Sequence, residues 1–305
     1  MTGLDILHAI QSIHSPLLDT FFYAMTQLHQ ETFYVLVLPL LYWLYDKRFA
    51  RYMVSVFLLG FWANNVLKFS FNTARPSPKD VRVIHPETGG GPAFPSGHSQ
   101  NPLMFWGALA AQWRKPWFTA LATVIIFLIG YSRLYLGLHW PLDVVGGWAI
   151  GAVMLYGFAK PRRFWTGEGM SFGQQALWAV VIPLITLSLS LVKGYTVAWD
   201  TPKAMADETW ALTGAYMGFW LGAVLEERFV GFDPRQGTVV LQVTKVITGL
   251  ALVFAVKEGF KVFLPANALG DLLRYGCMTL AATYVVPWIF RRFGHTTTVG
   301  RAVSR

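Results

Sequence analysis

Apolar residues gather in long segments along this chain, and short polar stretches separate them. A helix needs roughly 17–25 mostly apolar residues to cross the hydrocarbon core of a bilayer. The pattern predicts membrane-spanning helices over residues 31–45, 52–72, 97–113, 117–134 and 141–159, and then over 174–193, 208–226, 239–263 and 268–290. We therefore expect an all-α protein, a polytopic membrane helical bundle.

The first thirty residues carry a weaker pattern. Apolar residues recur every three or four positions from Ile6 to Leu17, which favours a short helix lying in the membrane interface. Residues 16–28 are also apolar, but the segment is short and Asp19 interrupts it. It forms either part of an interface helix or a weak first span, and the hydrophobic pattern leaves both open. With this weak helix counted, we expect a six-helix core and about four additional C-terminal helices.

A polar and basic stretch from Lys160 to Met170 follows the fifth clear span. We use it to divide the chain into a core, residues 1–163, and a C-terminal transmembrane extension, residues 164–305. The two parts share no convincing internal repeat, and the pattern gives the extension no role.

The composition agrees with a membrane protein. Hydrophobic residues make up 54% of the chain and charged residues 13%, whereas a soluble protein carries about 25% charged residues. The formal net charge is +9. The basic residues cluster in short loops and form no patch with interleaved aromatic residues, so we expect no nucleic-acid partner. The single cysteine, Cys277, excludes an intrachain disulfide and a cysteine metal site.

The basic loops also predict the orientation of the helices, because lysine and arginine concentrate in cytoplasmic loops. Here they follow the first, third and fifth clear spans, at Lys47, Arg48, Arg51, Arg114, Lys115, Lys160, Arg162 and Arg163. The opposite ends of these spans are less basic and therefore face away from the cytoplasm. That side holds a series of polar residues beside the apolar segments.

Lys68 and Arg75 close one of these segments. They are seven residues apart, two turns of a helix, so we expect both side chains on one helical face. Pro76 then interrupts the helix. A single basic residue at the end of a span is usually an interfacial anchor. Two on one face favour an anion site, although anchoring stays open.

Pro95, Ser96, Gly97 and His98 precede the next segment. Serine is a favoured N-cap, and the N-terminus of a helix with accessible N–H groups binds anions. The alternative is a simple capped helix start. His98 argues against that alternative, because an imidazole beside an anion site can donate or accept a proton near neutral pH.

A third group of polar residues consists of Ser132, Arg133, His139 and Asp143. His139 and Asp143 are four apart, so on a helix the carboxylate can bond one imidazole nitrogen and leave the other free to attack. A histidine beside Trp140 is otherwise an ordinary interface residue. Asp143 is harder to explain without a partner, because it leads into an apolar helix.

Together the three groups resemble the phosphatidic acid phosphatase type 2 superfamily of integral-membrane lipid phosphatases. The pattern is Lys, six residues, Arg-Pro; then Pro-Ser-Gly-His; then Ser-Arg, five residues, His, three residues, Asp. It is met at Lys68, Arg75, Pro76, Pro95, Ser96, Gly97, His98, Ser132, Arg133, His139 and Asp143. The resemblance covers roughly residues 15–160, so it makes residues 1–163 a lipid phosphatase catalytic core.

The resemblance implies a role for each residue. His139 is the nucleophile and becomes a phosphohistidine, Asp143 orients it, and His98 protonates the leaving oxygen and then activates water. The phosphoryl oxygens are bound by Lys68, Arg75, Arg133, Ser96 and the Gly97 N–H. It implies no cofactor and no metal.

The substrate that the resemblance implies is a lipid phosphate or pyrophosphate, of the undecaprenyl pyrophosphate, phosphatidate or phosphatidylglycerol phosphate class, drawn from the surrounding membrane lipids. We expect a bacterial plasma membrane with the active site on the extracytoplasmic side. Two alternatives stay open: a phosphotransferase that passes the phosphoryl group to a second lipid, and a non-catalytic lipid-binding or transport protein. A soluble vanadate-dependent haloperoxidase shares the motif, but the number of spans argues against it.

The loop over residues 77–94 lies between two of the motif groups. It contains Gly89, Gly90 and Gly91 and several prolines, which punctuate any loop. It is either a plain connector or a lid in which His85 or Glu87 contacts the lipid headgroup.

Overall fold

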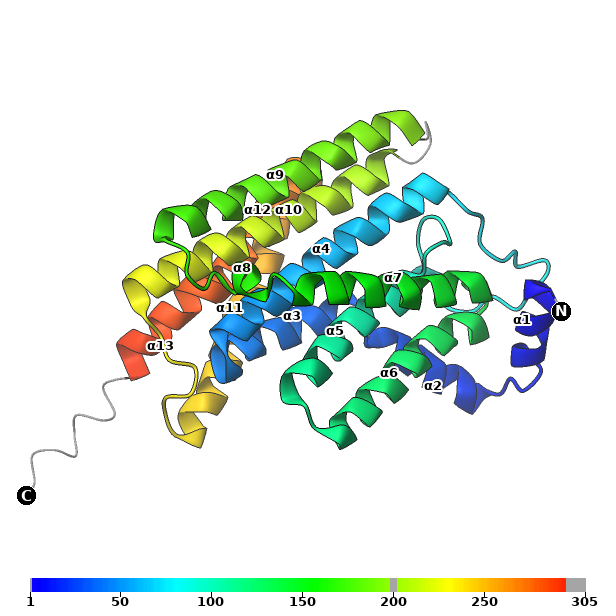
Figure 1. Ribbon diagram of the computed structural model, residues 1–305, viewed down its shortest axis with the longest axis horizontal. Coiled ribbons are helices and arrows are strands. Elements are labelled where there is room, and N and C mark those ends of the chain that lie inside the picture. The colour runs from blue at the N-terminus through cyan, green and yellow to red at the C-terminus, as the bar shows by residue number, and fades with distance from the viewer. Residues whose placement is uncertain (1, 198–201, 295–305) are drawn as a thin grey trace, which may run out of the picture. The chain divides into compact units, whose positions relative to one another are not determined.

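The computed structural model describes residues 2–197 and 202–294, and all regular secondary structure within these ranges is helical (Figure 1). The contacts between residues in space divide the chain into two compact units. The first consists mainly of residues 2–35 and 55–162, and the second of 36–54, 163–195 and 202–294. The division into a catalytic core and an extension stays a prediction. Residues 295–305, the end of that extension, lie outside the described residues.

The first unit contains two short helices followed by longer ones. Its elements are α1 (Gly3–Gln11), α2 (Pro16–Gln27), the start of α3 (Glu31–Leu40), most of α4 (Lys47–Phe71), α5 (Gly97–Trp113), α6 (Pro116–Tyr135) and α7 (Pro141–Ala159). A single 3-10 turn, Pro86–Thr88, lies in the long connection between α4 and α5.

The second unit holds the remaining helices, three of which pass into π-helical turns. Its elements are the end of α3 with its π-turn Leu41–Tyr45, the first residues of α4, α8 (Arg162–Thr166), α9 (Phe172–Val197), α10 (Pro202–Leu225) with Glu226–Val230, α11 (Val239–Phe263), and α12 (Ala268–Leu280), which continues through Ala281–Val285 into α13 (Val286–Gly294).

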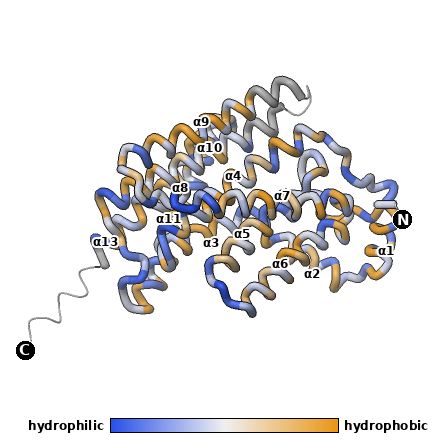
Figure 2. The backbone as a smooth tube through the Cα atoms, in the orientation of Figure 1, coloured by the Kyte–Doolittle hydropathy of each residue, from blue (hydrophilic) through white to orange (hydrophobic). Residues whose placement is uncertain are grey.

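Within the described residues, five helices are long and apolar enough to cross a membrane, so the predicted polytopic helical bundle is confirmed. They cover Lys47–Phe71, Pro116–Tyr135, Pro141–Ala159, Phe172–Leu191 and Val239–Phe263. Figure 2 shows hydrophobic residues along the helices and hydrophilic ones at turns such as that between α5 and α6. Large apolar side chains, among them Val124, Val153 and Ile247, are exposed on these helices, as lipid-facing residues are.

The weak N-terminal segment folds as two helices, α1 and α2. Thr2 caps α1 in a reciprocal hydrogen-bonding pattern with Asp5. Helix α2 has 12 residues, which at 1.5 Å per residue gives about 18 Å, well short of a hydrocarbon core of about 30 Å. Phe22 of α2 packs on Tyr135 of α6, with ring centroids 4.5 Å apart. Helix α2 therefore packs against α6 and is too short to span the membrane alone.

Asp19, which interrupts the apolar pattern of α2, holds a loop in place. Its carboxylate accepts hydrogen bonds from both terminal nitrogens of Arg82, one of them 2.9 Å long, and from the Tyr135 hydroxyl at 2.7 Å. The Gln11 side chain adds bonds to the backbone N–H and carbonyl of Arg82. The middle of the connection between α4 and α5 is thereby fixed to α1 and α2.

Helices α5 and α7 approach each other closely at two glycines. A Cβ on Gly147 would lie 2.6 Å from the carbonyl oxygen of Ser96, and one on Gly151 would lie 2.8 Å from that of Gln100. The Ser96 N–H also donates to the Asp143 carbonyl at 3.0 Å. The glycines thus place the start of α5 directly against the start of α7.

The second unit packs α10 on α12 by the same device, with Gly214, Gly218 and Gly222 facing the α12 backbone and the Thr283 side chain. Glu226, fully buried at the end of α10, accepts hydrogen bonds from the Tyr42 hydroxyl at 3.0 Å and from Lys47 Nζ at 2.9 Å. The charge of Glu226 is therefore paired within this unit.

We predict that Gly147→Ala destabilises the protein by about 1–3 kcal/mol, the usual effect of overpacking a tight interface. The added methyl group meets backbone atoms of α5, which cannot move aside as a flexible side chain would. Gly157→Ala on the same helix is the control, because a Cβ there meets nothing within 4 Å. Thermal unfolding in detergent compares the two, and equal melting temperatures would contradict the proposed close approach.

We predict that Asp19→Asn lowers stability by on the order of 1 kcal/mol or less, because the ion pair is partly exposed. The hydrogen bond from Arg82 lowers the pKa of Asp19 from 3.8 to about 2. A carboxylate with a depressed pKa stabilises the fold above its unfolded pKa, and loses this effect as the pH falls toward the folded value. The wild-type advantage in melting temperature should therefore be constant from pH 5 to 8 and shrink below about pH 4. An advantage independent of pH throughout would contradict this assignment.

Candidate active site

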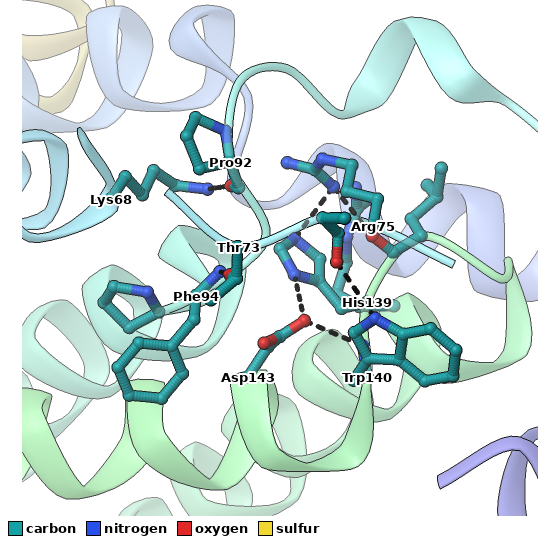
Figure 3. Close-up of polar contacts among 12 residues, drawn as sticks. Lys68, Thr73, Arg75, Pro92, Phe94, His139, Trp140 and Asp143 are labelled. Atoms are coloured by element: carbon teal, nitrogen blue, oxygen red, sulfur yellow. Dashed lines mark hydrogen bonds and ion pairs between the residues drawn. The ribbon is translucent and has the colours of Figure 1, made fainter. Parts of the chain in front are cut away.

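His139 and Asp143 form a buried pair at the start of α7. The carboxylate of Asp143 lies 3.3 Å from His139 Nδ1 and also accepts the backbone N–H of Trp140 at 2.8 Å (Figure 3). We expected both residues on a helix, but α7 begins at Pro141, so His139 lies just before it. The pair forms because Asp143, in the first turn, reaches back to cap the helix start.

The hydrogen bonds of His139 fix its tautomer. Arg75 Nη1 lies 3.1 Å from Nε2 of His139, and a guanidinium can only donate. Nε2 is therefore the acceptor, and the ring proton sits on Nδ1, facing Asp143. Burial, followed by the charges of Arg75 and Lys68, holds the pKa of His139 well below its usual value. The imidazole is neutral near pH 7, with the lone pair of Nε2 directed toward Arg75.

Lys68 and Arg75 contact the same loop, but Lys68 lies in a helix and Arg75 lies beyond its end. Helix α4 ends at Phe71, and Asn72 follows in the left-handed region at φ 45°. Arg75 is therefore outside the helix, and the predicted shared helical face is wrong. Lys68 Nζ donates to the carbonyl of Pro92 at 2.6 Å (Figure 3).

Arg133 is the most deeply buried of the three cations, with no exposed surface. Its Nη1 donates to the hydroxyls of Thr26 at 2.5 Å and Thr88 at 3.1 Å, and its Nη2 donates to the Thr88 carbonyl at 3.1 Å. The Nε atom is also buried and has no hydrogen-bond partner among the described residues. This N–H is a donor that a phosphoryl oxygen could use.

Ser96 occupies the N-cap of α5, as predicted, and Gly97 is the first helical residue. The Ser96 side chain does not cap the helix, and its buried Oγ has no hydrogen-bond partner in the part of the chain that the structure describes. The same holds for Nε2 of His98. Through its backbone N–H, Ser96 is tied to Asp143, as described above. The predicted anion site thus adjoins the histidine–aspartate pair.

The structure therefore brings all eight predicted site residues into the first unit. Direct contacts join His139 to Asp143 and to Arg75, while Lys68, Arg75 and Arg133 converge on one loop segment. His98 lies within electrostatic range of Arg133 and His139.

His29 is a neighbour of the site that the sequence did not indicate. Its ring centroid lies 4.3 Å from that of His98, edge to face, and its Nδ1 lies 3.2 Å from the Tyr34 hydroxyl. No motif spacing links residue 29 to residue 98, and the short turn between α2 and α3 gives no pattern. Only the tertiary arrangement reveals this contact.

Asn64 and Gln100 also support the site without a sequence signal. Asn64 Nδ2 donates to the Gln100 side chain at 2.9 Å and to the Pro95 carbonyl at 3.3 Å. Gln100 Nε2 in turn donates to the carbonyl of Gly60 at 2.9 Å. This buried network fixes the start of α5 on α4.

Among the side chains that the structure describes, no group of three or more histidine, cysteine, aspartate or glutamate residues could hold a metal ion. Besides Asp143 and the histidines, the polar side chains that converge on the site are cationic or hydroxylic. Such groups bind an anion, and a phosphate fits their charge and their hydrogen-bonding capacity.

Comparison with known proteins agrees with this geometry. Residues 48–166 match the PAP2 superfamily, and residues 210–298 match the transmembrane extension of PAP2 superfamily phosphatases. The chain is 32% identical over 163 residues to a lipid A 4'-phosphatase of Bacteroides thetaiotaomicron, which covers 48% of this chain and 71% of that protein.

Two eukaryotic relatives are more distant in sequence. Sphingosine-1-phosphate phosphatase 2 of Mus musculus is 27% identical over 254 residues, 76% of this chain and 69% of the relative. Lipid phosphate phosphatase delta of Arabidopsis thaliana is 29% identical over 168 residues, 50% of this chain and only 40% of the plant protein's length. No solved structure matches the chain. The chain is an integral membrane protein, and it belongs to the PAP2 superfamily of lipid phosphatases.

Proposed function

We propose that the protein removes a phosphate group from a lipid through a phosphohistidine formed on His139. The observation that carries the proposal is the state of His139. It is buried and neutral, with the protonated Nδ1 facing Asp143 and the unprotonated Nε2 facing Arg75. A buried histidine kept for packing alone has no need of a carboxylate on one nitrogen and a cation on the other.

The first step forms a bond between His139 Nε2 and phosphorus and breaks the bond from phosphorus to the lipid oxygen. His98 donates a proton to that leaving oxygen, so the lipid departs as an alcohol. Asp143 stabilises the positive charge that develops on the phosphorylated imidazole. In the second step His98 accepts a proton from water, which attacks phosphorus and releases phosphate and the free histidine.

Lys68, Arg75 and Arg133 supply the charge that the transition state requires. Fixed donors aimed at a developing negative charge are usually the largest catalytic contribution, and the loss of one lowers the rate on the order of 10²–10³-fold. The Ser96 Oγ, which has no partner in the described ranges, and the N–H of Gly97 at the start of α5 complete the set of donors.

The names of the relatives favour a lipid phosphate monoester as the substrate. One relative is named for sphingosine 1-phosphate and another for the 4'-phosphate of lipid A. A lipid pyrophosphate such as undecaprenyl pyrophosphate is the second substrate class, because the site binds only the terminal phosphoryl group.

The relatives include mammalian, plant and bacterial proteins and so do not favour the expected bacterial membrane. We further propose that the site faces away from the cytoplasm, because the basic loops lie at the other ends of the core spans.

We predict that the full chain in detergent releases inorganic phosphate from lipid phosphates, and that His139→Asn lowers turnover on the order of 10³-fold or more. His14→Asn is the control, since His14 is exposed and its ring has a hydrogen bond only to the Gln11 carbonyl among the described residues. The panel contains sphingosine 1-phosphate, phosphatidate and undecaprenyl pyrophosphate.

Near wild-type turnover of the His139 variant would rule out the proposed nucleophile. Transfer of the phosphoryl group to an added lipid alcohol, without release of phosphate, would identify a phosphotransferase instead. A wild-type chain that binds these lipids without turnover would identify a binding protein.

A further inference from the structure

The segment Thr88–Pro92 lies against all three cations of the proposed phosphate site. Arg75 donates from Nε to the Gly91 carbonyl at 2.9 Å and from Nη2 to the Gly90 carbonyl at 2.7 Å. Arg133 donates to the Thr88 carbonyl, and Lys68 to that of Pro92. Four of the five carbonyl groups in this segment therefore accept hydrogen bonds from cationic side chains.

This arrangement is unusual for a connecting loop, because a loop ordinarily exposes its backbone polar groups to water. The three cations come from α4, from the extended residues after it, and from α6. The segment Thr88–Pro92 thus links Lys68, Arg75 and Arg133 to one another through its backbone carbonyls.

Both ends of the segment are fixed. Thr88 accepts a hydrogen bond from Arg133 and donates its own hydroxyl to the carbonyl of His85 at 2.8 Å. Beyond Pro92, the N–H groups of Ala93 and Phe94 donate to the carbonyl and the hydroxyl of Thr73 at 2.9 and 2.8 Å. The lid and the connector both stay predictions, and the backbone carbonyls of the segment contact the cations of the proposed phosphate site.

Gly89 lies where two of the guanidinium groups meet. A Cβ at this position would be 3.0 Å from Arg75 Nη1 and 3.1 Å from Arg133 Nη2. The backbone of Gly89 is extended, with φ −134° and ψ 129°, a conformation open to any residue. The need for glycine here comes from the two arginines and not from the backbone conformation. A Cβ on the neighbouring Gly90 would meet nothing within 4 Å.

Two like charges repel when they converge in a buried place, and acceptor groups must hold them there. The carbonyls of the segment provide these acceptors, while the bare Cα of Gly89 lets both guanidinium groups approach the same point. A phosphoryl group, with several charged oxygens, matches two guanidinium groups held in this way.

We infer that Gly89 is a positioning residue of the phosphate site, and that with the carbonyls of Thr88–Pro92 it sets the spacing of Arg75 and Arg133 around the phosphoryl group. This inference rests on the proposed phosphatase function. Gly89 does not itself contact the reacting atoms, and it acts through the two arginines.

The test is Gly89→Ala in the full chain, with inhibition by inorganic phosphate as the main readout. The methyl group makes one or both guanidinium groups give way by a few tenths of an ångström, so we expect kcat/KM to fall about tenfold. The inhibition constant for inorganic phosphate should rise by a similar factor, about tenfold. Phosphate carries no lipid, so this constant reports on the cation site alone.

Two comparison variants make the result specific. Gly90→Ala lies one residue away and adds its methyl group to open space, so its effect on phosphate inhibition should be much smaller than that of Gly89→Ala. Gly157→Ala on α7 lies outside the site and should behave as wild type. If Gly89→Ala and Gly90→Ala are equal in both kcat/KM and phosphate inhibition, the inference is wrong.

Thr88→Val covers the case in which Gly89→Ala does not fold. It removes the hydroxyl that accepts from Arg133 and leaves the backbone unchanged. We expect weaker phosphate inhibition by several-fold, together with a lower melting temperature because the bonds to Arg133 and to the His85 carbonyl are lost. Wild-type inhibition would overturn the inference. A wild-type chain that releases no phosphate from any lipid would instead overturn the proposed function, and the inference with it.

Discussion

Three positive charges held together beside a buried histidine are the constraint on which the first unit depends. Lys68 and Arg133 are buried and Arg75 is partly buried, although removing a charge from water is costly without acceptors. The acceptors come from the carbonyls of the Thr88–Pro92 segment and from the hydroxyls of Thr26 and Thr88. The connection between α4 and α5 is thus shaped by the cations that it must satisfy.

The same charges define the chemistry of His139. Together with burial they keep its imidazole neutral, and the contact with Arg75 leaves Nε2 as the acceptor nitrogen. Asp143 supports the opposite nitrogen and, through its backbone carbonyl, holds Ser96. The close contact of α5 with α7, which Gly147 permits, lets one aspartate contact both the proposed nucleophile and the proposed anion site.

Much of this arrangement could be predicted from the sequence, because it depends on hydrophobic length and motif spacing. The helices over 97–113, 141–159 and 239–263 begin and end where the apolar pattern predicted. The prediction that Lys68 and Arg75 share a helical face was wrong, because the left-handed backbone of Asn72 ends the helix before Arg75. The hydrophobic periodicity of a sequence does not indicate such a residue.

Other parts had no signal to find. The carbonyls that hold the cations belong to the backbone, so their role is independent of side-chain identity and leaves no motif. His29 reaches His98 only through tertiary packing. Helix α2 was ambiguous because its apolar residues serve contacts with α6, and such contacts produce the same composition as a short span.

The most direct test of the account is to trap the phosphoenzyme. The chain is mixed with a lipid phosphate labelled with ³²P, quenched within milliseconds in alkaline detergent, and digested for mass spectrometry. A phosphorus–nitrogen bond to imidazole is stable in alkali and labile in acid, so we predict an alkali-stable, acid-labile label on the peptide that carries His139. Label on a residue other than His139 would contradict the account. Turnover without any labelled intermediate would also contradict it, if Asp143→Asn still released phosphate at the wild-type rate.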